Sequence, residues 1–145
     1  MIQLPQGVWR ETVDVFRSCG RGRKECVVYW VGRGSEPGRV DRAVHPKHSA
    51  TPRHYEVDGE WLTGFWIELG SSGEIVRVQV HTHGRLAGHS PTDEGGAIVY
   101  QPGFLSLVLP WFAMEADPRA GAFLADLGEH GEWEEVIVGD RLQWA

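Results

Sequence analysis

Two histidines separated by one residue, His81 and His83, end a stretch that alternates apolar and polar side chains, EIVRVQVHTH. In a β-strand, residues two apart point to the same face at a spacing of about 7 Å, so both imidazoles can reach one metal ion. Asp93 follows a glycine-containing loop that can fold back toward the strand end. Two histidines and one carboxylate leave a fourth position open for water, which is the arrangement of a catalytic zinc site.

Two alternatives concern the third ligand. The segment SPTD, from Ser90 to Asp93, is also a good helix start, because Ser suits the N-cap, Pro the first helical position and an acidic residue the first turn. A capped helix start needs no function, yet it is also a rigid place from which to aim a ligand. His89 lies in the same loop, and a neutral imidazole is as good a zinc donor as a carboxylate, so it competes with Asp93.

The other potential ligands lack a recognisable spacing. The only two cysteines, Cys19 and Cys26, do not form the C-x-x-C pattern that is typical of structural zinc sites, and we expect ordinary reduced thiols. The remaining histidines have no companion at ligand spacing, so we expect them to be exposed or packed without a metal: His45, His48, His54 and His130.

The elements that must position the histidines follow from the apolar pattern. Helical spacing predicts a helix over residues 7–19, and the uninterrupted apolar run CVVYWV predicts a strand over 26–31 that is buried on both faces, with Glu25 at its entrance. Residues 33–54 are rich in Gly, Pro and Arg and read as an irregular loop with one short strand around 39–44. A second helix is expected over 61–69, before the His-x-His strand.

The rest of the chain extends this alternation. We expect a short helix over residues 90–100, a buried strand over 104–112, a helix near 120–127, and a hairpin over 134–145 with Gly-Asp at its turn. These elements predict a single α/β domain, residues 1–145, with a mixed sheet between helices.

Composition narrows the function. The 14 basic and 20 acidic residues give a net charge of -6, which argues against nucleic acid as a partner, because phosphate binding depends on concentrated Lys and Arg. No segment approaches the roughly 20 apolar residues of a membrane helix, and the first residues do not resemble an export signal. We therefore expect a cytoplasmic protein without membrane contact.

The order of the candidate residues resembles the JAMM motif of JAB1/MPN domain metallopeptidases: Glu25, then His81-x-His83, then Ser90-x-x-Asp93. The resemblance covers nearly the whole chain, since the predicted helices and strands recur in the same order in that family. The sequence departs from the motif at two points. Gly84 follows the second histidine where Pro is common, and six residues, where seven are more usual, separate His83 from Ser90.

The resemblance implies a curved mixed sheet flanked by helices and a zinc-dependent peptidase. It assigns Glu25 as the general base, with His81, His83 and Asp93 as the Zn²⁺ ligands. It also assigns the Ser90 hydroxyl to stabilisation of the oxyanion.

A small domain of this kind resembles the standalone prokaryotic enzymes that release ubiquitin-like proteins from conjugates or trim their tails. The resemblance therefore implies an isopeptidase that cuts after the C-terminal glycine of a ubiquitin-like modifier, with E1-like and E2-like proteins as possible pathway partners. Two other functions stay open. One is the release of cysteine or another small adduct from a sulfur-carrier protein, and the other is a non-catalytic MPN scaffold.

Overall fold

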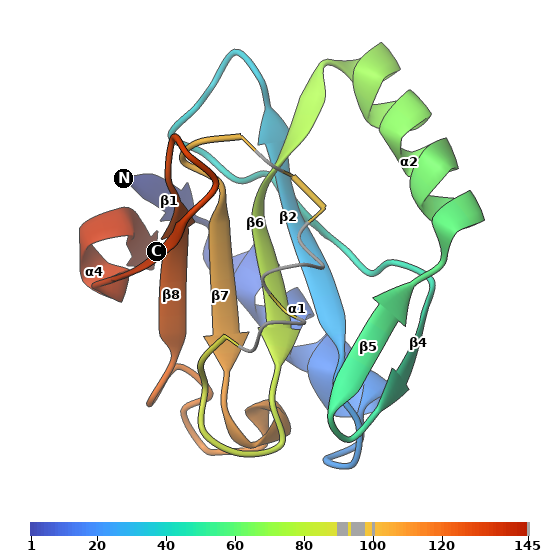
Figure 1. Ribbon diagram of the computed structural model, residues 1–145, viewed down its shortest axis with the longest axis vertical. Helices are drawn as coiled ribbons and strands as arrows, with labels where there is room; N and C mark the ends of the chain where they lie inside the picture. Colours follow the sequence, from blue (N-terminus) through green and yellow to red (C-terminus); the bar gives the residue numbers. More distant parts are fainter. Residues whose placement is uncertain (90–92, 94–97, 100, 145) are drawn as a thin grey trace.

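The computed structural model describes residues 1–89, 93, 98–99 and 101–144. Its centre is a six-stranded mixed sheet with helices on both faces (Figure 1). In spatial order the strands are β3 (Arg42–Val44), β2 (Val27–Arg33), β6 (Glu74–Thr82), β7 (Leu105–Leu109), β8 (Phe123–Leu127) and β9 (Trp133–Val136). Only the pairing of β6 with β7 is parallel, and the other neighbours are antiparallel. The predicted α/β class with a mixed sheet between helices is confirmed.

Helix α1 (Gln6–Cys19) and helix α2 (Gly59–Ser72) pack on opposite faces of this sheet, and Figure 1 shows α1 behind the central strands. Along β2, Val28 and Trp30 join the core under α1, whereas Val27 and Tyr29 join the core under α2. Because side chains alternate between the two faces, a strand covered on both sides must be apolar at every position. This explains why the CVVYWV run contains no polar residue.

A buried polar contact fixes α1 against β2. The buried stripe of α1 is Val8, Thr12 and Phe16, which follow one another at four-residue intervals. The Trp30 indole N–H donates to Thr12 Oγ1 at 2.9 Å, and the Thr12 hydroxyl donates to the Val8 carbonyl at 2.8 Å. Both polar groups are thereby satisfied inside the core.

Two small sheets complete the fold. Strand β1 (Ile2–Leu4) pairs in parallel with β10 (Leu142–Trp144), so the two ends of the chain lie side by side. Strands β4 (His48–Thr51) and β5 (His54–Val57) form a hairpin. It begins inside residues 33–54, which we predicted to be mainly an irregular loop. That prediction was wrong because the Gly- and Pro-rich composition of residues 33–47 hid the short alternating strands that follow.

Two predictions for the last third of the chain were also wrong. The helix expected near 120–127 is the strand β8, because pairing with the buried strand β7 overrides the local helix preference of Ala and Leu. The hairpin expected over 134–145 does not form, since its proposed turn lies in the helical segment α4 (Val138–Arg141). The Arg141 guanidinium donates to Asp126 at 2.9 Å, and the chain then leaves the main sheet to join β1.

Cys19 and Cys26 are joined by a disulfide, so the expectation of reduced thiols was wrong. Between them, Arg21 and Gly22 adopt left-handed backbone angles and turn the chain from α1 toward β2. The turn brings the two Cα atoms to 6.4 Å, within the range that a disulfide requires.

The helix predicted over residues 90–100 falls mostly outside the described residues, although Asp93 is helical. Within the part of the chain that the structure describes, no helix has the length and apolar character needed to cross a bilayer.

Candidate metal centre

The register between β2 and β6 assembles most of the site. Val27 pairs with His81 in this antiparallel ladder, which places Glu25, two residues earlier, opposite His83, two residues later. The pairing extends past the end of the ladder, because the Thr82 N–H donates to the Cys26 carbonyl at 3.1 Å and the Cys26 N–H donates to the Thr82 hydroxyl at 2.9 Å. Glu25 is therefore held beside the two histidines by backbone pairing.

Asp93 completes a cluster with Glu25, His81 and His83 in which one ligand atom from each residue lies within 4.8 Å of all the others. The two Nε2 atoms of the histidines are 3.2 Å apart. Asp93 places Oδ2 3.1 Å from His83 Nε2 and Oδ1 3.4 Å from His81 Nε2. The structure thus brings together four of the five residues of the predicted site, while Ser90 lies outside the described residues.

These separations fit a tetrahedral metal ion. With metal–ligand bonds of about 2.0 to 2.1 Å, donor atoms at tetrahedral angles are separated by about 3.3 Å. The three measured separations, 3.2, 3.1 and 3.4 Å, lie close to that value. Two neutral imidazoles whose Nε2 lone pairs converge also repel each other unless a cation or a proton lies between them. The donor set suits Zn²⁺, which binds imidazole nitrogen and carboxylate oxygen.

Burial changes the protonation of Glu25, which is only 4% exposed. Desolvation of the carboxylate raises its pKa to about 7, an effect that the positive charge of His83 opposes and the negative charge of Asp93 reinforces. A carboxyl group with a pKa near neutrality can both accept and return a proton, which is what general acid–base catalysis needs.

The two histidines differ in their environments. His81 is fully buried, and desolvation lowers its pKa despite the nearby carboxylate of Asp93. Burial also disfavours charge on His83, but the hydrogen bond and charge of Asp93, together with the charge of Glu25, outweigh it, so the pKa of His83 is raised. Without a metal, His83 is therefore the first of the two to take up a proton.

His89, the alternative third ligand, is directed elsewhere. Its Nε2 contacts the Ser106 hydroxyl at 2.8 Å, and its ring packs 5.0 Å from the rings of Phe123 and Trp133. Burial, with a contribution from His81, lowers the pKa of His89 to about 4. These contacts identify a packed, neutral histidine and favour Asp93 as the third donor.

Tyr55 is a member of the site that the sequence did not reveal. Its ring lies 5.2 Å from the ring of His81, and its hydroxyl accepts a hydrogen bond from Gln79 at 3.0 Å. Burial, followed by the charges of neighbouring groups that include Asp93 and Glu25, raises its pKa well above the usual value. The alternation of β5 was the signal that could have located it.

The ring of Phe112 packs closely on Gly84, where the JAMM motif commonly has proline. A Cβ atom at Gly84 would lie 2.5 Å from the Phe112 ring, which occupies the space above this residue. The Phe112 N–H donates to the His83 carbonyl at 2.7 Å, and the His83 N–H donates to the Leu109 carbonyl at 2.9 Å. The end of β7 and the turn that follows it therefore hold the backbone of His83 through two hydrogen bonds.

An open cleft with a volume of about 670 Å³ adjoins the cluster. Glu25 and His83 lie on its wall, together with Arg53, Arg85 and Phe112. A second groove of about 380 Å³ runs along β5 and reaches Asp93. Both spaces meet the cluster, so a bound chain has a route to it.

The chain matches no protein-family model. It is 29% identical over 140 residues to the probable metalloprotease y4jG of Sinorhizobium fredii, an alignment that covers 93% of this chain and 86% of that protein.

Solved structures share the fold over nearly the whole chain. Protein DSY2949 from Desulfitobacterium hafniense has a TM-score of 0.67 at 20% identity and covers 100% of this chain and 94% of its own. The JAB1/MPN domain protein AF2198 from Archaeoglobus fulgidus has a TM-score of 0.58 at 12% identity, with coverages of 99% and 97%. The predicted resemblance to JAB1/MPN domain proteins is confirmed in the fold, and together with the metalloprotease relative it supports a metallopeptidase.

The raised pKa of Glu25 predicts a pH-dependent stability of the metal-free protein. The folded protein binds the Glu25 proton up to about pH 7, whereas a carboxyl group with the ordinary value of 4.5 releases it earlier. The contribution of Glu25 to the free energy of unfolding is therefore fully present below pH 4.5 and is lost as the pH rises toward 7. Glu25→Gln has no ionisable group at this position and avoids the loss. The Tm of the variant minus the Tm of the wild type should therefore be larger at about pH 8 than at about pH 5.

Thermal unfolding in the presence of a chelator measures this effect, with the exposed Glu129→Gln as the matched control. An equal Tm difference for Glu25→Gln at both pH values would contradict the raised pKa.

Proposed function

We propose that this chain is a zinc-dependent peptidase in which His81, His83 and Asp93 hold the metal and Glu25 is the general base. The observation that carries the proposal is the set of three donor atoms at tetrahedral spacing beside a buried carboxylate. The JAB1/MPN fold and the probable metalloprotease relative support the same class. Three protein ligands, in place of the four of a structural site, leave one coordination position for a reactant.

When bound, Zn²⁺ supplies Lewis acidity that polarises a carbonyl group and acidifies a water molecule. Glu25 can accept the proton of the attacking water and return it to the leaving amine, because its carboxylate lies beside the metal ligands and on the wall of the cleft. The burial of Glu25 and His81 limits exchange with bulk solvent and strengthens the local electrostatic interactions. Ser90 is proposed as the oxyanion donor from the motif, and loss of such a donor typically costs about 3 to 4 kcal/mol in the barrier.

The proposed substrate is the C-terminal tail of a ubiquitin-like protein, cut after its last glycine. Among the described strands, β5 pairs only with β4, which leaves its outer edge available for backbone pairing with an extended peptide. The groove along β5 reaches Asp93, so a tail paired with β5 would arrive at the metal ligands. Glycines suit this route because the backbone of a tail without side chains can approach closely.

A second candidate is the release of cysteine or another small adduct from a sulfur-carrier protein. Arg53 and Arg85 line the larger cleft, together with Glu25 and His83. Arginine binds carboxylates through paired hydrogen bonds, so these residues could hold the carboxylate of a small leaving group.

The proposed roles predict different losses for two substitutions. Glu25→Gln should keep the fold and one equivalent of zinc but lower kcat by about 100-fold or more, because it removes the proton acceptor. His83→Ala should lose the zinc, because it removes a ligand. Zinc analysis and peptidase assays on protein with the Cys19–Cys26 disulfide intact provide the measurement, and Glu129→Gln serves as the exposed control. Full turnover by Glu25→Gln would exclude the general-base role.

Three substrates distinguish the proposed reactions of the zinc-loaded protein. They are a modifier joined to a lysine through an isopeptide bond, a precursor with a peptide extension after its terminal glycine, and a sulfur-carrier protein bearing a C-terminal cysteine adduct. Mass spectrometry should show cleavage after the glycine of the first two. Release of the adduct alone would favour the second candidate, and no cleavage of any of the three would contradict both.

A further inference from the structure

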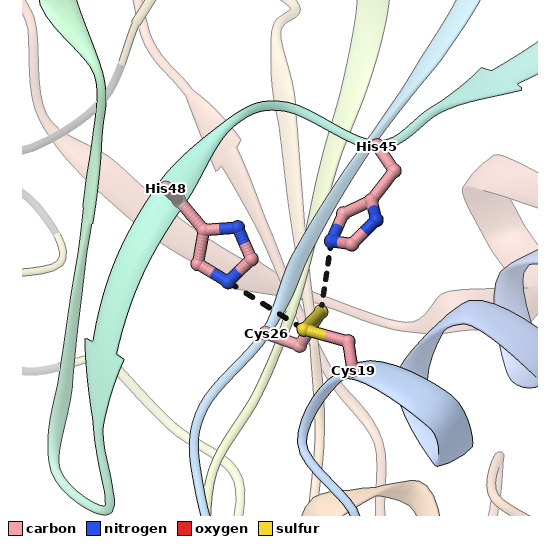
Figure 2. Close-up of side chains that lie close together, drawn as sticks. All are labelled: Cys19, Cys26, His45 and His48. Atoms are coloured by element: carbon pink, nitrogen blue, oxygen red, sulfur yellow. Dashed lines mark hydrogen bonds between the residues drawn. A yellow bond between two sulfur atoms is a disulfide. The ribbon is translucent and has the colours of Figure 1, made fainter.

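A second group of potential ligands shares no residue with the cluster of Glu25, His81, His83 and Asp93. Cys19 ends α1, Cys26 immediately precedes β2, His45 follows β3, and His48 begins β4 (Figure 2). One ligand atom from each of these residues lies within 4.8 Å of all the others. The prediction that His45 and His48 have no companion was wrong, because the fold brings together residues that have no ligand spacing along the chain.

The nitrogen–sulfur distances match a tetrahedral zinc site. His45 Nε2 is 3.5 Å from Cys26 Sγ, and His48 Nε2 is 3.5 Å from Cys19 Sγ. With zinc–sulfur bonds of about 2.3 Å and zinc–nitrogen bonds of about 2.0 to 2.1 Å, tetrahedral geometry separates the two kinds of donor by about 3.6 Å. Figure 2 shows both imidazoles directed at the pair of sulfur atoms from the same side.

The tautomer of His48 prepares its Nε2 for a metal. His48 Nδ1 lies 3.0 Å from the Pro46 carbonyl oxygen, which can only accept a hydrogen bond. Nδ1 must therefore carry the proton, so in the neutral ring Nε2 presents its lone pair to Cys19. A backbone carbonyl that fixes the second ring nitrogen is the usual support of a metal-binding histidine.

The disulfide between Cys19 and Cys26 does not account for this arrangement. A disulfide sulfur carries no hydrogen, and neither does Nε2 of neutral His48, so their contact is not a hydrogen bond. A cation, by contrast, would be attracted to both imidazole lone pairs and to thiolates at the positions of the two sulfurs. The position of His48 is therefore better explained by a metal than by the disulfide, and His45 approaches the second sulfur at the same distance.

We propose that Cys19, Cys26, His45 and His48 bind Zn²⁺ when the two cysteines are reduced, and that the disulfide is the metal-free form of the same site. Four protein ligands of the Cys₂His₂ type leave no position for water, which is characteristic of a structural zinc site. The two forms exclude each other, because a sulfur in a disulfide cannot act as a thiolate ligand.

A phosphine reductant can convert the disulfide form into the zinc-binding dithiol form. The phosphine transfers two electrons to the disulfide, and water supplies the two thiol protons and the oxygen atom of the resulting phosphine oxide. Zn²⁺ then binds the two sulfurs as thiolates and releases the two protons.

The site would link the end of α1, the start of β2 and the start of β4 next to the proposed general base. Glu25 directly precedes Cys26, and its N–H donates to the Thr51 carbonyl of β4 at 3.0 Å. His48 belongs to the same strand. A metal between Cys26 and His48 would therefore hold β2 and β4 together on either side of Glu25 and give it a fixed position.

Cobalt is the probe that tests the proposal on the full chain. Co²⁺ bound by thiolates produces a sulfur-to-cobalt charge-transfer band, which the sulfur-free cluster of His81, His83 and Asp93 cannot produce. The phosphine-reduced protein should show this band with one equivalent of thiolate-bound cobalt, and the oxidised protein should lack it. Added Zn²⁺ should abolish the band by displacing the cobalt.

Substitutions assign the ligands. Loss of a residue that only hydrogen-bonds to a metal ligand typically lowers the metal affinity about 10- to 100-fold. His48→Ala and His45→Ala each remove a ligand itself, so each should lower the affinity for thiolate-bound cobalt by about 100-fold or more. Cys19→Ser should remove most of the band. The exposed His130→Ala is the matched control and should bind like wild type. Circular dichroism checks that each variant is folded.

His83→Ala separates this site from the proposed catalytic centre. It should keep the charge-transfer band, and zinc should still raise the Tm of the reduced variant. No charge-transfer band in the reduced wild type would overturn the proposal, as would affinities unchanged by both His45→Ala and His48→Ala. A band without peptidase activity would leave this site standing while contradicting the proposed function.

Discussion

Two buried strands, β2 and β6, run antiparallel, and their register pairs Val27 with His81. The register cannot slip by one residue without moving the Val28–Trp30 face of β2 from the α1 core to the α2 core. The apolar packing of two helices thus fixes where the ends of these strands meet. Glu25 and His83 lie at that meeting point, so the geometry of the site depends on core packing.

Burial at the strand ends has an electrostatic cost. Glu25 and Asp93 are like charges close to two imidazoles, and the desolvation that raises the pKa of Glu25 disfavours its charged form. A dication would offset much of this cost because it attracts both carboxylates and both imidazole lone pairs. The site therefore gives up some stability of the metal-free protein in return for groups that can bind a metal and move a proton.

The sequence predicted the parts of the molecule that depend on local pattern. The buried strands β2, β6 and β7 and the convergence of His81 and His83 follow from apolar runs and from strand periodicity. Glu25 was found only through the resemblance, because a single acidic residue before a strand carries no local signal. The group around Cys19 and His48 was missed for a related reason, since long-range packing alone brings its members together. Tyr55 was missed although the alternation of β5 could have located it. The helix predicted at β8 failed because pairing with β7 outweighs local propensity.

The two residues that precede β2 connect the two clusters, since Glu25 belongs to one of them and Cys26 to the other. The central claim is that His81, His83 and Asp93 together bind a metal ion. An anomalous difference map from zinc-loaded crystals, recorded on either side of the zinc absorption edge, tests it most directly. We expect a peak within bonding distance of His81 Nε2, His83 Nε2 and an Asp93 carboxylate oxygen. A map from fully loaded crystals with no peak between these three residues would contradict it.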